Sequence, residues 1–184
     1  MLVVTAPAKV NLFLGVGAAR PDGYHDVTTV LHALSLHDTL EISPAETLTL
    51  DCEPDLGIPA EKNLAWRAAT EFSRAVGREP AVALRLRKRI PHGAGLGGGS
   101  SDAAAVIAGL ASLWGLPRDD ERCEAVARAL GADVAFFLEP AGAALMTGRG
   151  DVIEQALRPL AGVPVALVRP ETPVPTPAAY AAFD

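Results

Sequence analysis

Pro91-His-Gly-Ala-Gly-Leu-Gly-Gly-Gly-Ser-Ser-Asp102 is the stretch that decides how the rest of the chain is interpreted. Five of its first nine residues are glycine, and two hydroxyls and an acid follow them. Glycines remove the Cβ atoms that would keep a ligand off the backbone, and they adopt positive φ without steric cost. An alternating run over residues 81–90 leads into the stretch and an alanine-rich helical pattern leads out of it. Because a helix N-terminus offers unpaired N–H groups and a partial positive charge, the stretch predicts a turn that holds a phosphorylated ligand.

The composition is that of an ordinary globular protein. The chain has 184 residues, of which 49% are apolar and 21% charged, and this length suffices for one well-buried domain. The net charge is −6 without any basic run, so we expect no nucleic-acid partner and no membrane partner. Cys52 and Cys123 lack metal-ligand spacing, and Cys123 falls on the apolar side of a helical pattern, which predicts a buried free thiol. With no stretch as long as a membrane span, these features predict a cytoplasmic protein.

Strands are expected in a group before most of the helices. Residues 2–6 predict a strand that breaks at Pro7, and residues 9–16 resume it with period two, so that Lys9, Asn11 and Phe13 share one face. The other predicted strands are 27–36, 40–43, 47–52, 81–90, 163–168 and a hairpin of 142–147 with 152–157. The predicted helices are 62–76, 103–114 with Ser100 or Ser101 as its cap, and 119–130. This order favours an α+β fold over a doubly wound sheet.

Three kinds of glycine loop compete for residues 91–102. A P-loop needs a lysine and a Ser or Thr directly after its last glycine, whereas Gly99 is followed by two serines and an aspartate. Residues 93–98 match G-x-G-x-x-G literally, and Asp119 and Asp120 follow about twenty residues on, as in a dinucleotide fold. However, the preceding strand is rich in arginine and the two acids begin a helix, so this alternative ranks behind a longer glycine-serine loop that wraps ATP phosphates.

That third loop, Pro91-x-x-x-Gly-Leu-Gly-Gly-Gly-Ser-Ser, resembles the second motif of the GHMP kinases. Four more stretches resemble motifs of one branch of this family: Pro7-Ala-Lys9-Val-Asn11-Leu-Phe-Leu, Arg20-Pro-Asp-Gly-Tyr24-His25, Leu130-Gly-Ala-Asp133-Val and Pro175-Thr176-Pro177-x-x-Tyr180. The matches run from residue 7 to residue 180 in the right order. The resemblance implies the α+β fold of the GHMP kinase N-terminal domain, which is like domain 2 of ribosomal protein S5.

The resemblance also implies a division of the chain. Residues 1–158 would form the N-terminal ATP-binding domain, and residues 159–184 would begin a C-terminal α+β domain. GHMP kinases carry in that second domain a third glycine-rich motif, whereas only four residues follow Tyr180 here. We therefore expect a fragment or a truncated product. Two alternatives stay open: a non-catalytic nucleotide-binding fragment, and a GHMP kinase that acts on a mevalonate-like or homoserine-like alcohol.

The implied activity is ATP-dependent phosphorylation of a small-molecule alcohol. In the matching branch the acceptor is the 2-hydroxyl of a cytidine diphosphate methylerythritol, in isoprenoid synthesis by the non-mevalonate route. Asp133 would be the base and Lys9 its partner, because a nearby ammonium keeps the acid ionised and stabilises charge on the attacking oxygen. The implied ligands of ATP, with Mg²⁺ shielding its phosphates, are Pro91, His92, Gly93, Ala94, Gly95, Leu96, Gly97, Gly98, Gly99, Ser100 and Ser101, with Asn63 and Lys88 near the nucleotide.

The acceptor side is assigned by the same resemblance. Tyr24 and Tyr180 would stack on the cytosine ring and His25 would read its polar edge. Asn11 and Thr176 would contact the diphosphate or the erythritol. The sequence shows no carboxylate cluster for a metal, so the metal ligands are left unassigned. For the assembly we expect a monomer or a weak homodimer.

Overall fold

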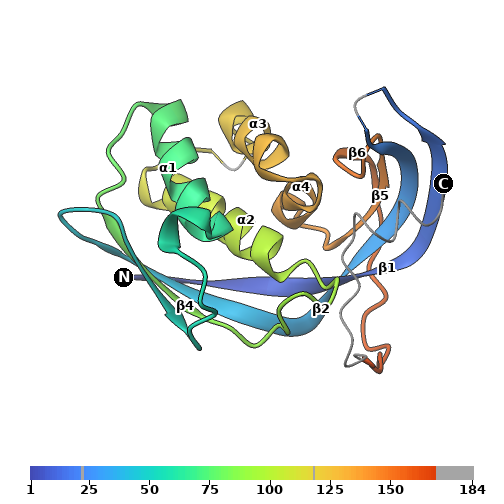
Figure 1. The fold of residues 1–184 in the computed structure, drawn as a ribbon, viewed down its shortest axis with the longest axis horizontal. Coiled ribbons are helices and arrows are strands. Elements are labelled where there is room, and N and C mark those ends of the chain that lie inside the picture. The colour runs from blue at the N-terminus through green and yellow to red at the C-terminus, as the bar shows by residue number, and fades with distance from the viewer. Residues whose placement is uncertain (22, 118, 169–184) are drawn as a thin grey trace.

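The computed structural model describes residues 1–21, 23–117 and 119–168, and in them a mixed sheet carries its helices on one face (Figure 1). The strands are β1 (Leu2–Ala19), β2 (His25–Pro44), β3 (Thr49–Glu53), β4 (Val82–Arg87), β5 (Ala143–Thr147) and β6 (Val152–Ala156). The helices are a 3₁₀ turn (Ala60–Lys62), α1 (Leu64–Val76), α2 (Gly98–Leu113), α3 (Glu121–Leu130) and α4 (Ala132–Leu138). The predicted α+β class is therefore confirmed.

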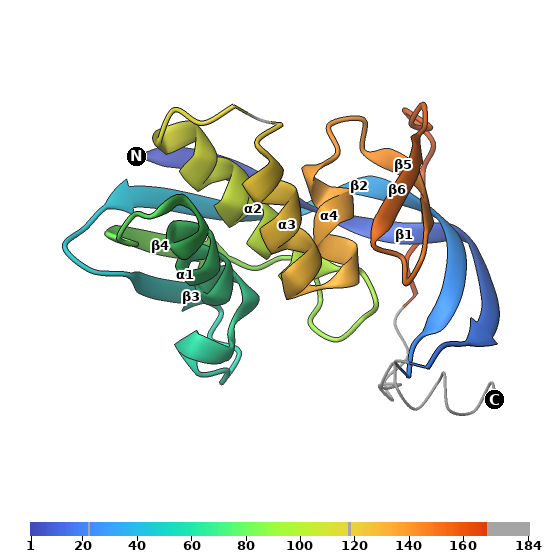
Figure 2. The ribbon, with the colours of Figure 1, turned by 90° about the horizontal axis from the view of Figure 1, so that it is seen from above.

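A long hairpin of β1 and β2 is the frame of the sheet. The strand order is β3-β4-β2-β5-β6, and β1 pairs with the other edge of β2. Residues 39–44 of β2 pair with β4, and residues 29–32 pair with β5, so one strand joins the two halves of the molecule. The pair β3–β4 is parallel and the others are antiparallel. Seen from above, α1 lies over β4, α2 and α3 lie next to it, and α4 lies nearest to β5 and β6 (Figure 2).

Two strand predictions were too fragmented. β1 continues through Pro7, and the predicted break there is wrong. The pairing register shifts between Pro7 and Lys9, which marks a bulge at this point. In the described residues β1 pairs only with β2, so on the unpaired edge of β1 the missing N–H of Pro7 breaks no hydrogen bond to another strand. The strands predicted at 27–36 and 40–43 are both parts of β2. Residues 163–168, predicted as a strand, are exposed and have no strand partner among the described residues.

The core lies between the sheet and α2. Its largest fully buried side chains include Phe72 of α1 and the inward-facing residues of β2 and β4, and Phe72 stacks on Trp114 at 5.8 Å between ring centroids. Alanines 103 to 105 let α2 lie close to the sheet, and the Cβ of a residue at Gly109 would collide with Ile42. Burial of this small-residue helix fixes the position of its N-terminus, where the glycine stretch ends.

The N-termini of α1 and α2 begin in different ways. Asn63 caps α1, because its Oδ1 accepts a hydrogen bond of 2.9 Å from the Ala65 N–H. α2 has no side-chain cap: it begins at Gly98 with Gly97 as the N-cap residue. The predicted cap at Ser100 or Ser101 is wrong, because the glycines themselves turn into the helix and both serines lie inside it.

Candidate functional site

The glycine stretch forms an open loop that ends on the N-terminus of α2. Gly93, Gly95 and Gly97 have φ angles of 69°, 72° and 69°, where a residue with a Cβ is strained. A Cβ at Gly93 or Gly95 would meet nothing within 4 Å, so this side of the loop is open. The first turn of α2 presents its N–H groups at the end of the loop without a side-chain cap. A positive helix end beside an unobstructed backbone fits an anion such as phosphate.

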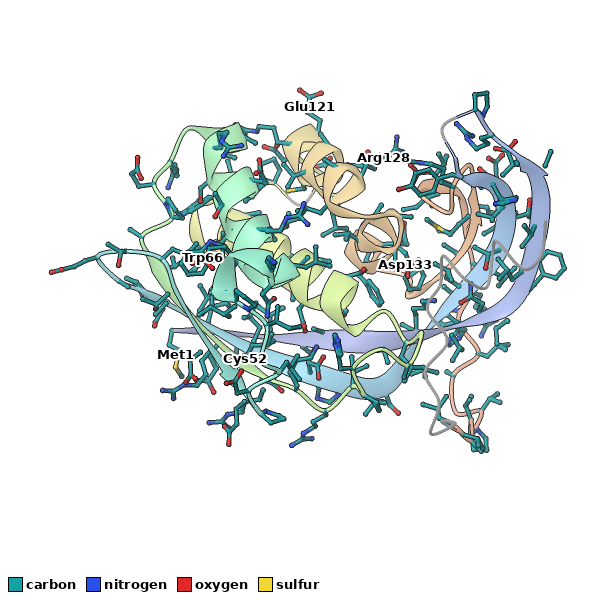
Figure 3. The ribbon with its side chains drawn as sticks, in the orientation of Figure 1. Met1, Cys52, Trp66, Glu121, Arg128 and Asp133 are labelled. Atoms are coloured by element: carbon teal, nitrogen blue, oxygen red, sulfur yellow. The ribbon has the colours of Figure 1, made fainter. Side chains whose placement is uncertain are left out.

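Lys9 and Asp133 lie together beside this loop. Lys9 Nζ is 3.7 Å from Asp133 Oδ2, and the two side chains are 8% and 36% exposed. The backbone N–H of Lys9 donates a hydrogen bond of 2.9 Å to the carbonyl of Leu96, so β1 is bonded to the loop itself. Asp133 lies in the first turn of α4, on the side of the sheet that carries the helices (Figure 3). β1, the glycine loop and α4 are far apart in sequence, yet they meet at Lys9 and Asp133, the two residues predicted to be catalytic.

A chain of hydrogen bonds orients the ammonium of Lys9. Lys9 Nζ donates to Asn11 Oδ1 at 2.8 Å, and Asn11 Nδ2 donates to Thr29 Oγ1 at 2.8 Å. The Thr29 hydroxyl donates in turn to the carbonyl of Phe13 at 2.6 Å. Asn11, predicted to contact the acceptor, thus holds Lys9 in place in this structure.

A buried group of three charges lies behind the loop. Lys88 Nζ is 2.5 Å from both Asp38 Oδ2 and Asp102 Oδ2, and the side chains are 7%, 0% and 3% exposed. Burial opposes the charge of Lys88, but the two carboxylates outweigh it and raise its pKa. Burial raises the pKa of Asp102 to about 7, although the ammonium acts in the opposite direction. The ammonium of Lys88, predicted to lie near the nucleotide, is thus enclosed by carboxylates beneath the loop.

Asn63, the other residue predicted near the nucleotide, borders a cavity between β3 and the start of α1. Besides Asn63, this cavity of about 340 Å³ is lined by Cys52, Asp55, Leu56 and Ile58, among others. The next residue, Leu64, has its Cδ1 3.5 Å from the place where a Cβ of Gly99 would be. The start of α1, which follows Asn63 directly, therefore adjoins the last glycine of the loop.

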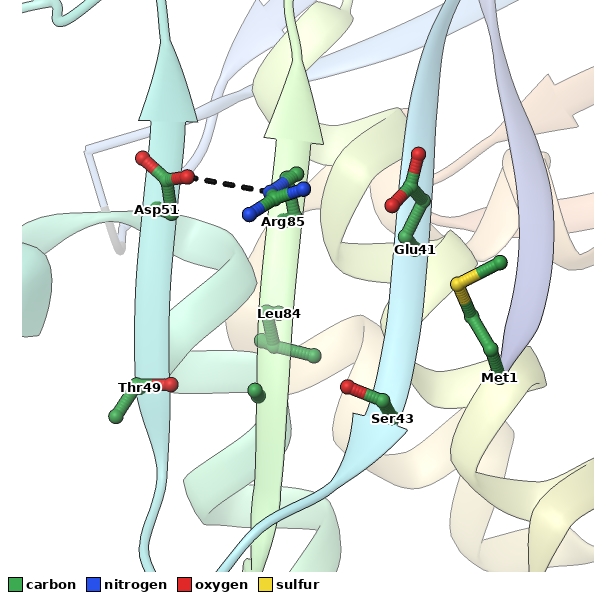
Figure 4. A pocket seen from close by; sticks show the side chains of 8 residues that line it. Met1, Glu41, Ser43, Thr49, Asp51, Leu84 and Arg85 are labelled. Atoms are coloured by element: carbon green, nitrogen blue, oxygen red, sulfur yellow. Dashed lines mark hydrogen bonds and ion pairs between the residues drawn. The ribbon is translucent and has the colours of Figure 1, made fainter.

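A second cavity, of about 290 Å³, contains none of the predicted residues. It lies around the pair of Asp51 and Arg85, whose closest N and O atoms are 3.3 Å apart. Figure 4 shows this cavity on the face of the sheet opposite the helices. We therefore do not assign it to the site.

The residues predicted on the acceptor side are only partly described. Tyr24 is 54% exposed, and the guanidinium carbon of Arg149 lies 4.9 Å from the centroid of its ring. His25, the first residue of β2, is 8% exposed. Thr176 and Tyr180 lie outside the described residues. The structure thus places Asn11 beside Lys9 and puts Tyr24 and His25 together at the turn between β1 and β2.

Two residues of this region were missed by the sequence reasoning: no role was given to Asp38 or Asp102. The alternation of side chains along β2 contains the signal for Asp38. Residues 38, 40 and 42 face the same way, and Leu40 and Ile42 belong to the core. Lys88 likewise continues the buried face of Val82, Leu84 and Leu86. An acid and a base on apolar strand faces predict a buried ion pair.

Three further observations concern metal binding, membrane insertion and the two cysteines. Within the described residues, no group of three or more His, Cys, Asp or Glu side chains is arranged to hold a metal ion. No helix in that part of the chain is both long and apolar enough to cross a membrane. Cys123 is buried and Cys52 half-buried, and both are free thiols, as predicted for Cys123.

Comparison with known proteins identifies the class. Residues 63–139 match the model of the GHMP kinases N terminal domain. A crystal structure of mevalonate kinase, 16% identical, covers 88% of this chain with a TM-score of 0.58 and shows the same fold. The chain therefore has the fold of the GHMP kinase N-terminal domain.

More similar proteins narrow the resemblance within that family. The 4-diphosphocytidyl-2-C-methyl-D-erythritol kinase of Salinibacter ruber is 44% identical over 97% of this chain and 64% of its own length. The enzyme of the same name from Nocardia farcinica is 49% identical over 82% of this chain and 50% of its own length. A crystal structure of 4-(cytidine 5'-diphospho)-2C-methyl-D-erythritol kinase, 40% identical, covers the whole chain and 65% of its own with a TM-score of 0.77. The chain is thus a homologue of this kinase and spans about half to two thirds of the length of these relatives.

Proposed function

We propose that this chain contains the ATP-binding and catalytic residues of a 4-diphosphocytidyl-2-C-methyl-D-erythritol kinase. The reaction is transfer of the γ-phosphoryl group of ATP to the 2-hydroxyl of the acceptor in the non-mevalonate isoprenoid pathway. The observation that carries the proposal is the Lys9–Asp133 pair, 3.7 Å apart and bonded through the Lys9 backbone to the glycine loop.

In this mechanism Asp133 is the general base. Its carboxylate is partly exposed and can reach a hydroxyl, and the ammonium of Lys9 lies 3.7 Å from it. The acceptor oxygen forms a bond to the γ-phosphorus as its proton passes to Asp133, and the bond from that phosphorus to the bridging oxygen of ADP breaks. Lys9, oriented by Asn11, neutralises the charge that develops on the attacking oxygen.

The donor phosphates are assigned to the loop. The N–H groups between Gly93 and Gly99 and the hydroxyl of the half-buried Ser100 are the proposed ligands. The hydroxyl of Ser101 is buried and has no hydrogen-bond partner in the described residues, so its predicted phosphate contact needs a local rearrangement of the helix start. Mg²⁺ is proposed to enter with the phosphates, because the described residues hold no cluster of ligands for it.

The remaining assignments follow the resemblance. The cavity beside Asn63 is the proposed place for the rest of the nucleotide. Tyr24 and His25 are proposed to bind the cytosine, together with Tyr180 and with Thr176 for the diphosphate or erythritol, the last two outside the described residues. We propose a cytoplasmic monomer or weak homodimer, in keeping with the two free cysteines.

Replacement of Asp133 by alanine tests the proposed base. We expect Asp133→Ala to abolish ADP release with the cytidylylated acceptor and to leave ATP binding by calorimetry unchanged. Asp119→Ala, which removes an exposed carboxylate before α3, is the matched control and should retain full turnover. Near-normal turnover by Asp133→Ala would reject the base.

The same assay separates the alternatives. Turnover with mevalonate or homoserine, and none with the cytidylylated acceptor, would change the substrate. ATP binding without turnover on any acceptor would favour the non-catalytic nucleotide-binding fragment.

A further inference from the structure

The three buried charges behind the glycine loop come from three different elements. Asp38 belongs to β2, Lys88 follows the end of β4, and Asp102 lies near the start of α2. The ammonium donates to both carboxylates at 2.5 Å. No part of the proposed phosphoryl transfer uses this cluster, and its almost complete burial keeps it from touching a substrate.

Asp38 fixes the chain where it enters the loop. Its Oδ1 accepts hydrogen bonds from the backbone N–H groups of Arg89 and Ile90, the second at 2.8 Å. Pro91 follows directly, so the loop starts from a backbone that is bonded to the middle of the sheet. All of these bonds converge on a side chain with no exposed surface.

Asp102 fixes the chain where it leaves the loop. Through Lys88 it connects the start of α2 to the same Asp38 that holds the entry. The contact is close: a Cβ at Gly98 would lie 3.3 Å from Lys88 Nζ and 3.0 Å from Ile90 Cγ2. The two ends of the loop are therefore tied to one ammonium directly beneath them.

Such a tie matters because the loop is rich in glycine. Glycine backbones lose the most conformational freedom on ordering, and a site that is ordered before its ligand arrives binds that ligand more tightly. We propose that Asp38, Lys88 and Asp102 form a positioning cluster that holds the glycine loop and the N-terminus of α2 in the arrangement that receives phosphate. The identity of that phosphate as ATP rests on the function proposed above. Lys88 then acts on the nucleotide through the loop and not by contact.

Asp102 is the residue that can test positioning apart from folding. Asp102→Ala removes the tie to α2 but leaves Lys88 paired with Asp38, so no buried charge is left without a partner. Asp102→Asn keeps an oxygen that accepts from Lys88 and serves as the conservative rescue. Asp119→Ala removes an exposed carboxylate before α3 and is the control.

Two measurements are made on the full chain: amide hydrogen exchange of residues 92–101 without nucleotide, and ATP binding by calorimetry. Since a hydrogen bond to a charged group is worth about tenfold or more in an equilibrium, Asp102→Ala should speed loop exchange and weaken ATP binding by about that factor. Exchange in α1 and α3 should not change. Asp102→Asn should stay within about threefold of the wild type, and Asp119→Ala should match the wild type.

Three results would overturn the positioning role: unchanged loop exchange in Asp102→Ala, faster exchange across the whole chain, or equal losses in the alanine and asparagine variants. Absence of ATP binding by the wild type would instead count against the proposed function. In that case the exchange data alone decide whether the cluster positions the loop.

Discussion

Alanine at Gly97 should cost much more stability than alanine at Gly93, although both glycines have a φ of 69°. The left-handed backbone region costs a residue with a Cβ about 1–2 kcal/mol, and this cost is common to the two variants. At Gly93 the new methyl group would meet nothing within 4 Å. At Gly97 it would lie 2.9 Å from Cζ of Phe137 and 3.0 Å from Cγ of Lys9. Overpacking of this kind adds about 1–3 kcal/mol, so we expect a loss of about 2–5 kcal/mol at Gly97 and about 1–2 kcal/mol at Gly93.

Urea unfolding followed by tryptophan fluorescence and by circular dichroism measures both free energies of unfolding. The contact with Lys9 adds a second expectation, because its side chain carries the ammonium that faces Asp133. Gly97→Ala should therefore lower turnover beyond any loss of ATP affinity. If the free energies of unfolding of the two variants agree within about 0.5 kcal/mol, the inferred packing of Gly97 against Phe137 and Lys9 is wrong.

Three further predictions concern the core, a helix cap and pH. Phe72→Ala should lower the free energy of unfolding by about 3–5 kcal/mol in urea titrations, because a fully buried ring is lost. Asn63→Ala should cost about 1 kcal/mol in the same titration through loss of the cap on Ala65, and Asn63→Asp should restore most of it. The pKa of Asp102 is raised from 3.8 to about 7, so the folded state binds the extra proton and stability falls as pH rises from about 4 to about 7. A pKa shift of this size corresponds to a fall in the free energy of unfolding on the order of 4 kcal/mol. Asp102→Asn should flatten the dependence of this free energy on pH between about 4 and about 7. If the variant shows a dependence as steep as that of the wild type, Asp102 is not its cause.

The sequence predicted most elements of the fold because their signals are local. The stripe of α1 and the glycine after it, the acids before α3 and the turn between β5 and β6 each depend on neighbours within a few residues. The errors arose where pairing overrides local preference. Pro7 stays within β1 because β1 pairs with β2 alone among the described residues, so no second strand requires a backbone N–H from Pro7. Residues 163–168 have the sequence pattern of a strand but no strand partner in the part of the chain that the structure describes.

The site residues were predicted from motifs. The prediction failed where the pairing register between β1 and β2 decides which way a side chain faces. Lys9 and Phe13 were expected on one face, yet Lys9 is 7% exposed and Phe13 is 54% exposed. The shift between Asn11 and Phe13 in the pairing with β2 separates them, and no periodicity in β1 alone contains that shift. Asp38 and Asp102 come from distant segments and are brought together by Lys88. The alternation of buried residues along β2 indicates that Asp38 is buried, whereas no strand pattern indicates the position of Asp102.

The glycine loop lies between two assemblies built from the same chemical groups, and exposure decides what each can do. Lys9 and Asp133 meet at 3.7 Å with the carboxylate 36% exposed, so the acid can exchange a proton with a bound alcohol. Lys88 and Asp102 meet at 2.5 Å with the carboxylate 3% exposed, so the acid can tie the start of α2 to Lys88 but cannot reach a substrate. A base needs an open face, whereas a tether is strongest when water cannot compete for its hydrogen bond. The division of labour that we propose follows from this difference: the open pair performs the proton transfer, and the closed cluster keeps the loop between them in the shape that brings phosphate to that pair.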